Sequence, residues 1–277
     1  MKTKLMMIFL CVVLVATSCG KKTGSIGPDS TSEIELRLNL HKGKVYDMKM
    51  VYSSQTETYM MGQKMDNSNS NTEIRMDYEV KDVLVNGNFL VRTTYKTLKM
   101  TTDVMDMKFS FDSETGSSSG MQGKEIDVMK ERIGQYAEME MDKLGKNIKT
   151  TMSPGLRSGD IITNVNYSVF PDKKIKIGDT WESDIKQDIN GYTTNGIIKT
   201  KFKLVSVKDG VAEISMDGAL DLKPGTEEEI TGTQKGTAKV EIATGVNNEV
   251  IIDQDVQIES NMGIKMIIKN KIRITIK

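Results

Sequence analysis

The sequence predicts a mainly β fold, an antiparallel meander of about a dozen strands with one short helix. From Glu33 onward, apolar and polar residues alternate with a period of two, which is typical of half-buried strands. Asn86-Gly87 and Asp209-Gly210 are dipeptides that favour two-residue hairpin turns. Only Lys124 to about Gly134 has helical spacing. Because exposed sheet edges must be covered or closed, we expect a curved half-barrel or a two-layer sheet, with the helix over one side or end.

The predicted elements of the first half end near residue 160. The helix would place Ile126, Met129 and Ile133 on one face and end at Gly134. The expected strands are Ile34–Leu40, Tyr46–Met50, Ile74–Val80, Phe89–Met100, Val104–Phe111, Ala137–Met141 and Ile148–Met152.

The second half restarts at Pro171 after a segment from Ile161 to Phe170 that also reads as a strand. The strands expected after it are one beginning near Trp181, then Thr193–Val207, Val211–Leu222, Glu228–Thr233, Thr237–Ala243, Glu249–Ser260 and Ile264–Lys277. In both halves a glycine stands three residues before a large aromatic residue that begins a long strand. We therefore expect one β-rich domain over residues 33–277, and the repeated pattern suggests two related halves, 33–160 and 161–277.

The N-terminus has the three parts of a secretory signal. Lys2 and Lys4 precede an apolar run of 11 residues, and small residues follow before Cys19. A membrane-spanning helix needs about 20 apolar residues, so this run predicts export, with residues 1–18 as the signal peptide. Residues 19–32 are rich in Gly, Ser and Lys and are expected to form a flexible tether.

Cys19, directly after Ala-Thr-Ser, resembles the lipobox of bacterial lipoproteins. The resemblance implies cleavage before Cys19 and acylation of its thiol and new amino group, so the membrane would be a partner through lipid. Gly20 follows the cysteine in place of the aspartate that retains such proteins at the inner membrane, and no acidic cluster for surface export is present. The implied location is the outer membrane, facing the periplasm.

Composition excludes several classes of function. Without residues 1–18 the chain has 36 basic and 38 acidic residues, which argues against nucleic acid as a partner. Cys11 leaves with the signal and Cys19 would carry lipid, so disulfides, thiolate metal sites and cysteine nucleophiles are excluded from the domain. His41 is the only histidine and is expected in an exposed turn. We therefore expect no cofactor, no metal site and no enzymatic activity.

The arrangement as a whole resembles a family of uncharacterised secreted lipoproteins of Gram-negative bacteria. No established activity of that family is available to transfer, so the resemblance implies compartment and fold only. Besides Cys19, the residues that carry it are Leu38-x-Leu40-x-Lys42-Gly43-x-x-Tyr46, Phe170-Pro171-x-Lys173-x-Ile175-x-Ile177-Gly178-Asp179-x-Trp181 and the run from Gly236 to Gly245.

Methionine is unusually frequent, with 17 residues after the signal against 14 aromatic ones. Methionine fills irregular cores and also lines adaptable binding surfaces, so it indicates either a packed core or an apolar cavity. Three Met-x-Met pairs would place both thioethers on one strand face. That arrangement suits Cu(I) but is also what core packing produces. The pairs are Met48 and Met50, Met105 and Met107, and Met139 and Met141.

Trp181, Asp179 and Tyr46 are the candidate ligand-binding residues. Gly178-Asp179-Thr180-Trp181 contains the only tryptophan, which could stack on a ligand beside an Asp179 anchor. In the alternative interpretation, Asp179 bonds backbone N–H groups of a turn and Trp181 packs in the core. Tyr46 is the aromatic residue at the corresponding place of the first half.

These features favour a non-catalytic binding module that holds a lipid-like or other apolar ligand against a Met-lined concave face. The alternative is a structural or protein-interaction component of the cell envelope, with a filled core and its function on the outer strands.

Overall fold

The computed structural model describes residues 32–121, 123–156, 169–186, 197–222 and 228–277. Within these residues it contains thirteen strands in one antiparallel sheet and a single helix. The predicted mainly β fold is thereby confirmed. The predicted signal peptide, Cys19 and almost all of the tether lie outside the described residues, as does most of the predicted strand Ile161–Phe170.

The first half of the chain contains seven strands and the helix. They are β1 (Val45–Met60), β2 (Gln63–Val83), β3 (Phe89–Val104), β4 (Met107–Asp112), β5 (Ser117–Ser119), α1 (Lys124–Glu131), β6 (Tyr136–Met141) and β7 (Asn147–Met152). The second half contains β8 (Thr180–Lys186), β9 (Ile197–Lys208), β10 (Val211–Leu222), β11 (Glu228–Glu241), β12 (Asn247–Ser260) and β13 (Ile264–Ile276).

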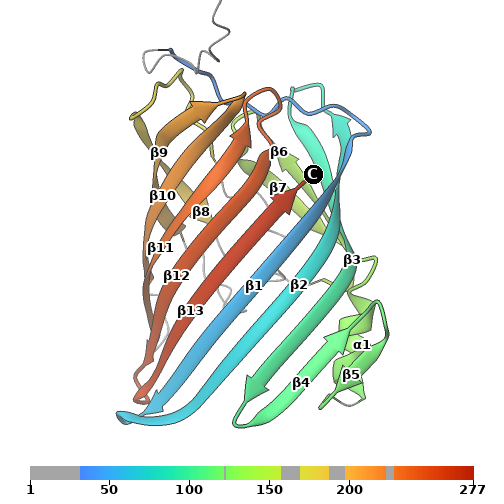
Figure 1. Ribbon diagram of the computed structural model, residues 1–277, viewed down its shortest axis with the longest axis vertical. Helices are drawn as coiled ribbons and strands as arrows, with labels where there is room; N and C mark the ends of the chain where they lie inside the picture. The colour runs from blue at the N-terminus through green and yellow to red at the C-terminus, as the bar shows by residue number, and fades with distance from the viewer. Residues whose placement is uncertain (1–31, 122, 157–168, 187–196, 223–227) are drawn as a thin grey trace, which may run out of the picture.

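The sheet follows chain order on both sides of one long-range junction. Its order is β5-β4-β3-β2-β1-β13-β12-β11-β10-β9-β8, and β6 and β7 branch from β3. The first and last strands of the chain are therefore neighbours, paired from Met48 with Ile276 to Met60 with Ile264. The sheet is strongly curved and does not close on itself (Figure 1), so the half-barrel is the arrangement found.

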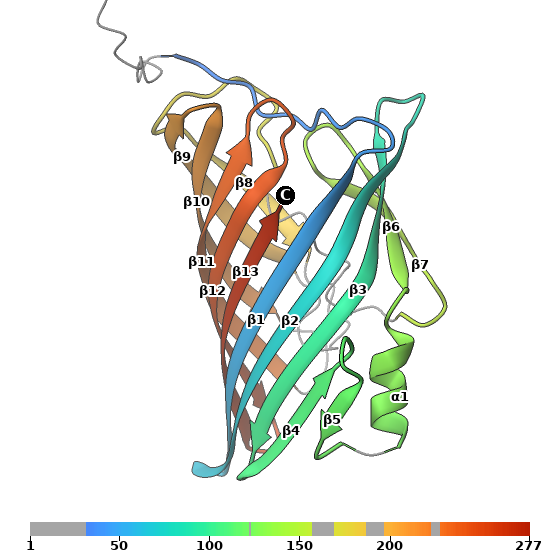
Figure 2. The same ribbon diagram turned by 45° about the vertical axis from the view of Figure 1, so that its right-hand side comes forward.

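The two ends of this half-barrel differ. We call the near end the one crossed by residues 32–40, and the far end the one that carries the β1–β2, β3–β4 and β12–β13 turns (Figures 1 and 2). The helix lies beside β4 and β5 (Figure 2). Ile126 and Met129 of the helix, and Ile133 in the turn after it, pack against the core. The helix ends at Glu131, three residues before the predicted end at Gly134. No helix in the described residues is long and apolar enough to cross a bilayer.

Opposite charges on the convex face set the strand register. One rank of directly opposed residues alternates acid and base across six strands, and opposed pairs of this kind stabilise a sheet. A slip of one residue would place these charges in the core. The rank is Glu182, Lys201, Asp217, Lys235, Asp253 and Lys271.

Residues 34–40 correct one predicted strand. Leu36, Leu38 and Leu40 are buried on alternate positions, as expected. Their segment, however, makes only an isolated bridge from Ile34 to Ile175, and the N–H of Leu38 bonds the carbonyl of Lys143. It is an extended strap across the near end, because a period of two reports which side is buried and not which chain is paired.

Two glycines of β11 let the β12 backbone approach closely. A Cβ on Gly236 would lie 2.4 Å from the carbonyl oxygen of Ile251, and one on Gly232 would lie 2.5 Å from that of Asp255. Glycine in a strand interior is typical of such close approaches and of bends.

We predict that Gly236→Ala lowers the free energy of unfolding by about 1–3 kcal/mol, because the added methyl group forces the backbone to shift. Thr237→Ala, on the exposed side of the same strand, is the matched control and should change it by less than about 1 kcal/mol. Urea denaturation measures both variants. Equal losses would show that the close approach is not what Gly236 provides.

Candidate functional site

The concave face is divided into three zones, and the first is a two-sided core at the near end. Here sheet residues pack against the strap of Leu36, Leu38 and Leu40 and against Phe170 and Ile175. Four paired methionines, Met48, Met50, Met139 and Met141, are buried in it. For these two pairs the structure supports the core interpretation.

The remaining pair, Met105 and Met107, corrects the prediction that all three lie on a buried strand face. Met105 is in the β3–β4 turn with a positive φ of 46°. Both side chains are exposed, by 61% and 55%. Spacing two implies a shared face only inside a strand, and a turn intervenes here.

The second zone is a ladder of polar side chains across the sheet. The Tyr52 hydroxyl donates to Oδ1 of Asn270 at 2.8 Å, and Nδ2 of Asn270 donates to Oε1 of Gln254 at 3.4 Å. Nε2 of Gln254 donates to Oε1 of Gln234 at 3.2 Å, and Nε2 of Gln234 donates to the Thr200 hydroxyl at 3.1 Å. We call these five residues the polar ladder.

Register explains the polar ladder. Asn270 is directly opposite Gln254, and Gln254 is directly opposite Gln234. Gly218 stands between Gln234 and Thr200 and leaves room for the glutamine side chain to reach the hydroxyl. The three amides and Thr200 are each less than 9% exposed. Buried amides need partners, and donors that run in one direction polarise one another.

The third zone is a second apolar cluster on the far-end side of the polar ladder. Within the described chain its members all come from β10 to β13 and from one face of the sheet, so no facing layer is among the residues that form it. We call this set the far cluster: Leu220, Ile230, Val256, Ile258 and Ile268, with Met266 packed against them.

Trp181 and Asp179 have structural partners. The Trp181 ring stacks on Phe202 with centroids 5.4 Å apart, and its Nε1 donates to the carbonyl of Val169 at 2.8 Å. The Asp179 carboxylate accepts the N–H of Lys176 at 3.0 Å, in a turn where Gly178 has a φ of 96°. These contacts are those of the core-and-turn interpretation, and ligand binding by the two residues stays a prediction.

Tyr46 borders the same core from β1. Its ring meets that of Tyr78 edge-on at 6.0 Å, and the Lys44 ammonium lies 5.3 Å from its centroid. Burial and then the charge of Glu241 raise the pKa of Tyr46. Five strands separate β1 from β8 in the sheet, so Tyr46 and Trp181 occupy different parts of the core rim.

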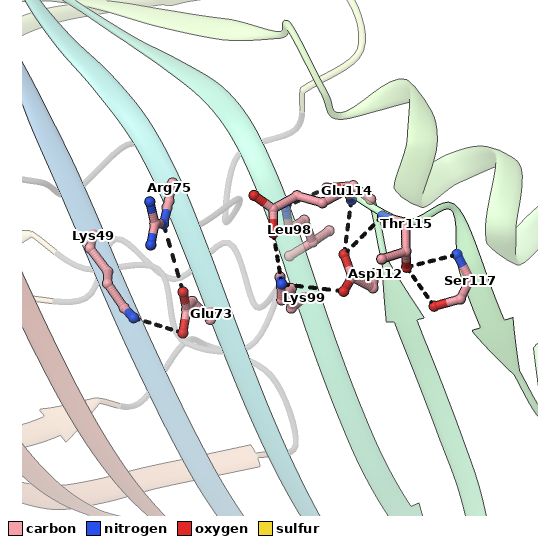
Figure 3. Close-up of polar contacts among 10 residues, drawn as sticks. Lys49, Glu73, Arg75, Leu98, Lys99, Asp112, Glu114, Thr115 and Ser117 are labelled. Carbon is pink, nitrogen blue, oxygen red and sulfur yellow. Dashed lines mark hydrogen bonds and ion pairs between the residues drawn. The ribbon is translucent and has the colours of Figure 1, made fainter.

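The convex face carries a surface pocket of about 350 Å³ whose lining includes Glu73, Lys99, Asp112 and Ser117. Lys99 bridges Glu114 at 2.7 Å and Asp112 at 3.3 Å, while Lys49 pairs with Glu73 at 2.8 Å (Figure 3). Hydrogen bonds that the Lys99 ammonium donates to Glu114 and Asp112 raise the pKa of Lys99. The charges are mutually satisfied on an exposed surface, so this pocket offers no activated group.

The described residues contain no group of three or more His, Cys, Asp or Glu side chains placed to hold a metal ion. His41 is exposed beside the turn at Lys42 and Gly43, as expected.

Sequence reasoning missed the polar ladder. Its signal was present: Gln254 and Asn270 stand at inward positions between buried apolar residues two places away, and Gln234 stands at an inward position between Gly232 and Gly236. A single polar residue at an inward position is hard to distinguish from the end of a strand unless it is known to lie opposite another polar residue on the neighbouring strand.

Comparison with known proteins finds a sequence match for part of the chain and a similar fold for most of it. Residues 162–247, about a third of the chain, match the model of a family of unknown function, DUF6263. The match includes the Phe170–Trp181 motif. Curated protein sequences contain no match to the chain.

Among solved structures, one that describes lipid–protein interactions in lipovitellin has a TM-score of 0.56 at 8% identity. It covers 86% of this chain and 25% of lipovitellin, so the chain spans about a quarter of that protein. An outer membrane channel from Pseudomonas putida F1 has a TM-score of 0.28 at 9% identity, over 87% of this chain and 97% of the channel. The score for the channel is too low to indicate a shared fold, whereas the score for lipovitellin indicates a shared fold and nothing more.

Removal of one amide from the polar ladder should be costly. We predict that Gln254→Ala lowers the free energy of unfolding by about 2–4 kcal/mol. The substitution removes the hydrogen-bond partner of the buried Gln234 and Asn270 amides and leaves a cavity. Gln257→Ala, on the outer face of the same strand, should cost less than about 0.5 kcal/mol. Chemical denaturation measures both, and a Gln254→Ala cost as small as that of the control would contradict the role of the ladder.

Proposed function

We propose that the protein is a non-catalytic, lipid-anchored binding protein of the cell envelope that holds a lipid-like or other apolar ligand. The observation that carries the proposal is the far cluster, an apolar layer whose members within the described chain all lie on one sheet face. Its five core side chains are 0% to 6% exposed, so an apolar ligand would bind there by replacing the groups that now cover them. The Met-rich zone at the near end is filled by the strap and its neighbours. We therefore place the ligand on the far cluster.

The chemistry of the two zones suits an amphipathic ligand. Each methylene group buried against the far cluster contributes about 0.8 kcal/mol, so an acyl chain gains affinity with length. The polar ladder borders the cluster along β11 to β13 and presents amides rather than charges. A ligand headgroup would lie at that border, and uncharged hydrogen-bonding groups fit it best.

The likeness in fold to lipovitellin, whose solved structure concerns lipid–protein interactions, supports the class of ligand. The composition argues against a catalytic constellation. No enzymatic role is part of the proposal.

The anchor completes the proposal. Acylation of Cys19 would hold the domain at the outer membrane, facing the periplasm, through the tether of residues 19–32. The membrane would then be the permanent partner, and the apolar molecule would be a reversibly bound ligand.

The alternative function is a structural or protein-interaction component of the envelope. The six exposed methionines at the far end would then be its contact surface.

Filling the far cluster should abolish ligand binding. We predict that Ile268→Trp, which enlarges a concave residue of β13, lowers the affinity for a fluorescent fatty-acid probe at least about tenfold, as loss of about 1.4 kcal/mol of contact would. Ile267→Trp is the matched control, since Ile267 is its neighbour on the opposite face. Probe titration measures affinity, and circular dichroism checks that both variants fold.

Two results would overturn the ligand proposal. One is a wild-type protein that neither displaces the probe nor retains a lipid in native mass spectrometry after gentle extraction. The other is a folded Ile268→Trp variant that binds the probe as well as Ile267→Trp does.

The anchor has its own test. Cys19→Ser removes the thiol that would be acylated, so we predict that the variant leaves the membrane fraction while the wild-type chain stays in it. Cell fractionation with immunoblotting measures the distribution. A variant that remains membrane-bound with the same protease accessibility as wild type would exclude acyl anchoring at Cys19.

A further inference from the structure

Exposed methionines are confined to the far end. Of the methionines in the described residues, six are exposed, by 44% to 84%, and all lie in or beside three hairpin turns. The β1–β2 turn carries Met60, Met61 and Met65, the β3–β4 turn carries Met105 and Met107, and the β12–β13 turn carries Met262. We call these six residues the methionine tips.

The turns that carry the methionine tips form one edge of the molecule. Both views show the three turns together at the far end (Figures 1 and 2). The N–H of Met61 donates to the carbonyl of Gly263 at 2.9 Å, which fixes the β1–β2 and β12–β13 turns side by side. The tips are therefore held in place by the sheet and not by loose loops.

Two of these methionines occupy backbone positions that other residues fit better. Met61 has a φ of 50° and Met105 a φ of 46°. In this left-handed region glycine, asparagine and aspartate are favoured, and other side chains are strained. Stability alone would place a glycine or an asparagine here, so both the strain and the exposure are costs that the apolar tips impose.

The charges beside two of the turns are neutralised within each hairpin. Lys64 pairs with Glu57 at 2.6 Å on the β1–β2 hairpin, and Lys265 pairs with Glu259 at 3.1 Å next to the β12–β13 turn. Apolar side chains project beyond these pairs. At these two hairpins the paired charges leave no strong field of one sign.

We propose that the methionine tips dock the far end on a zwitterionic lipid surface, with their side chains in the boundary between headgroups and acyl chains. Three separate projections match a soft, continuous surface better than a single protein pocket does. Unbranched, flexible thioethers also adapt to disordered chains, and paired charges fit zwitterionic headgroups. Interfacial binding grows with the apolar area inserted.

The docking site and the ligand site are independent in their evidence. The far cluster extends along β10 to β13 toward the same end, so a ligand held there would reach the lipid surface directly. Only that last step rests on the proposed function. Docking itself needs no ligand.

Methionine oxidation in the presence of vesicles tests the docking. The full chain is exposed to hydrogen peroxide with and without vesicles of phosphatidylcholine and phosphatidylethanolamine, and peptide mass spectrometry measures sulfoxide at each position. Oxidation follows exposure, so vesicles should slow it at Met61, Met105 and Met262 by about tenfold or more. An Ile148→Met variant supplies the control, because Ile148 is 52% exposed on β7, away from the tips. The methionine introduced there should react at the same rate with and without vesicles, within about twofold.

Each other outcome would overturn the proposal. Unprotected tips, or equal protection of the tips and of the Ile148→Met reporter, would exclude docking through this end. Protection without vesicles that rises with protein concentration would assign the tips to contact between two copies. The fatty-acid probe titration contains no vesicles, so its failure and a failure here are separate results.

Discussion

Strict alternation along paired strands is the constraint on which the whole structure depends. Each strand of the sheet sends one set of side chains to a charged convex face and the other to an apolar concave face. The acid–base rank from Glu182 to Lys271 joins six strands in a single register. That register also determines which concave residues meet, so the polar ladder and the far cluster depend on the same strand pairing that opposes these charges.

The concave face shows how one register can serve three purposes. At the near end the strap supplies a second layer, and the result is an ordinary two-sided core. At the polar ladder, four buried amide and hydroxyl side chains and Tyr52 form hydrogen bonds with one another across the strands of the sheet. Beyond it the apolar layer continues with a different set of neighbours. A two-sided core, a row of hydrogen-bonded polar side chains and a second apolar layer thus succeed one another along the strands.

The sequence predicted the class of fold because period two, hairpin dipeptides and one helical stretch are local signals. The helix face at Ile126 and the β6–β7 hairpin followed from the same rules. Pairing between β1 and β13 could not be predicted, since it joins residues more than 200 positions apart. The strap at Leu36 to Leu40 shows the complementary limit, because its alternation was predicted correctly but the segment forms one isolated bridge and no strand of the sheet. Tyr46 and Trp181 were chosen for their residue type, whereas the polar ladder is visible only once Gln234, Gln254 and Asn270 are seen to be opposed.

The junction between β1 and β13 has a consequence for how the molecule forms. The β1 strand is among the first parts of the domain to be synthesised, yet its second neighbour is the last strand of the chain. Until β13 arrives, β1 presents a bare edge of 16 residues, a template for wrong partners. Topologies dominated by such distant contacts assemble slowly. The nascent chain therefore keeps this edge unpaired until synthesis of β13 is complete.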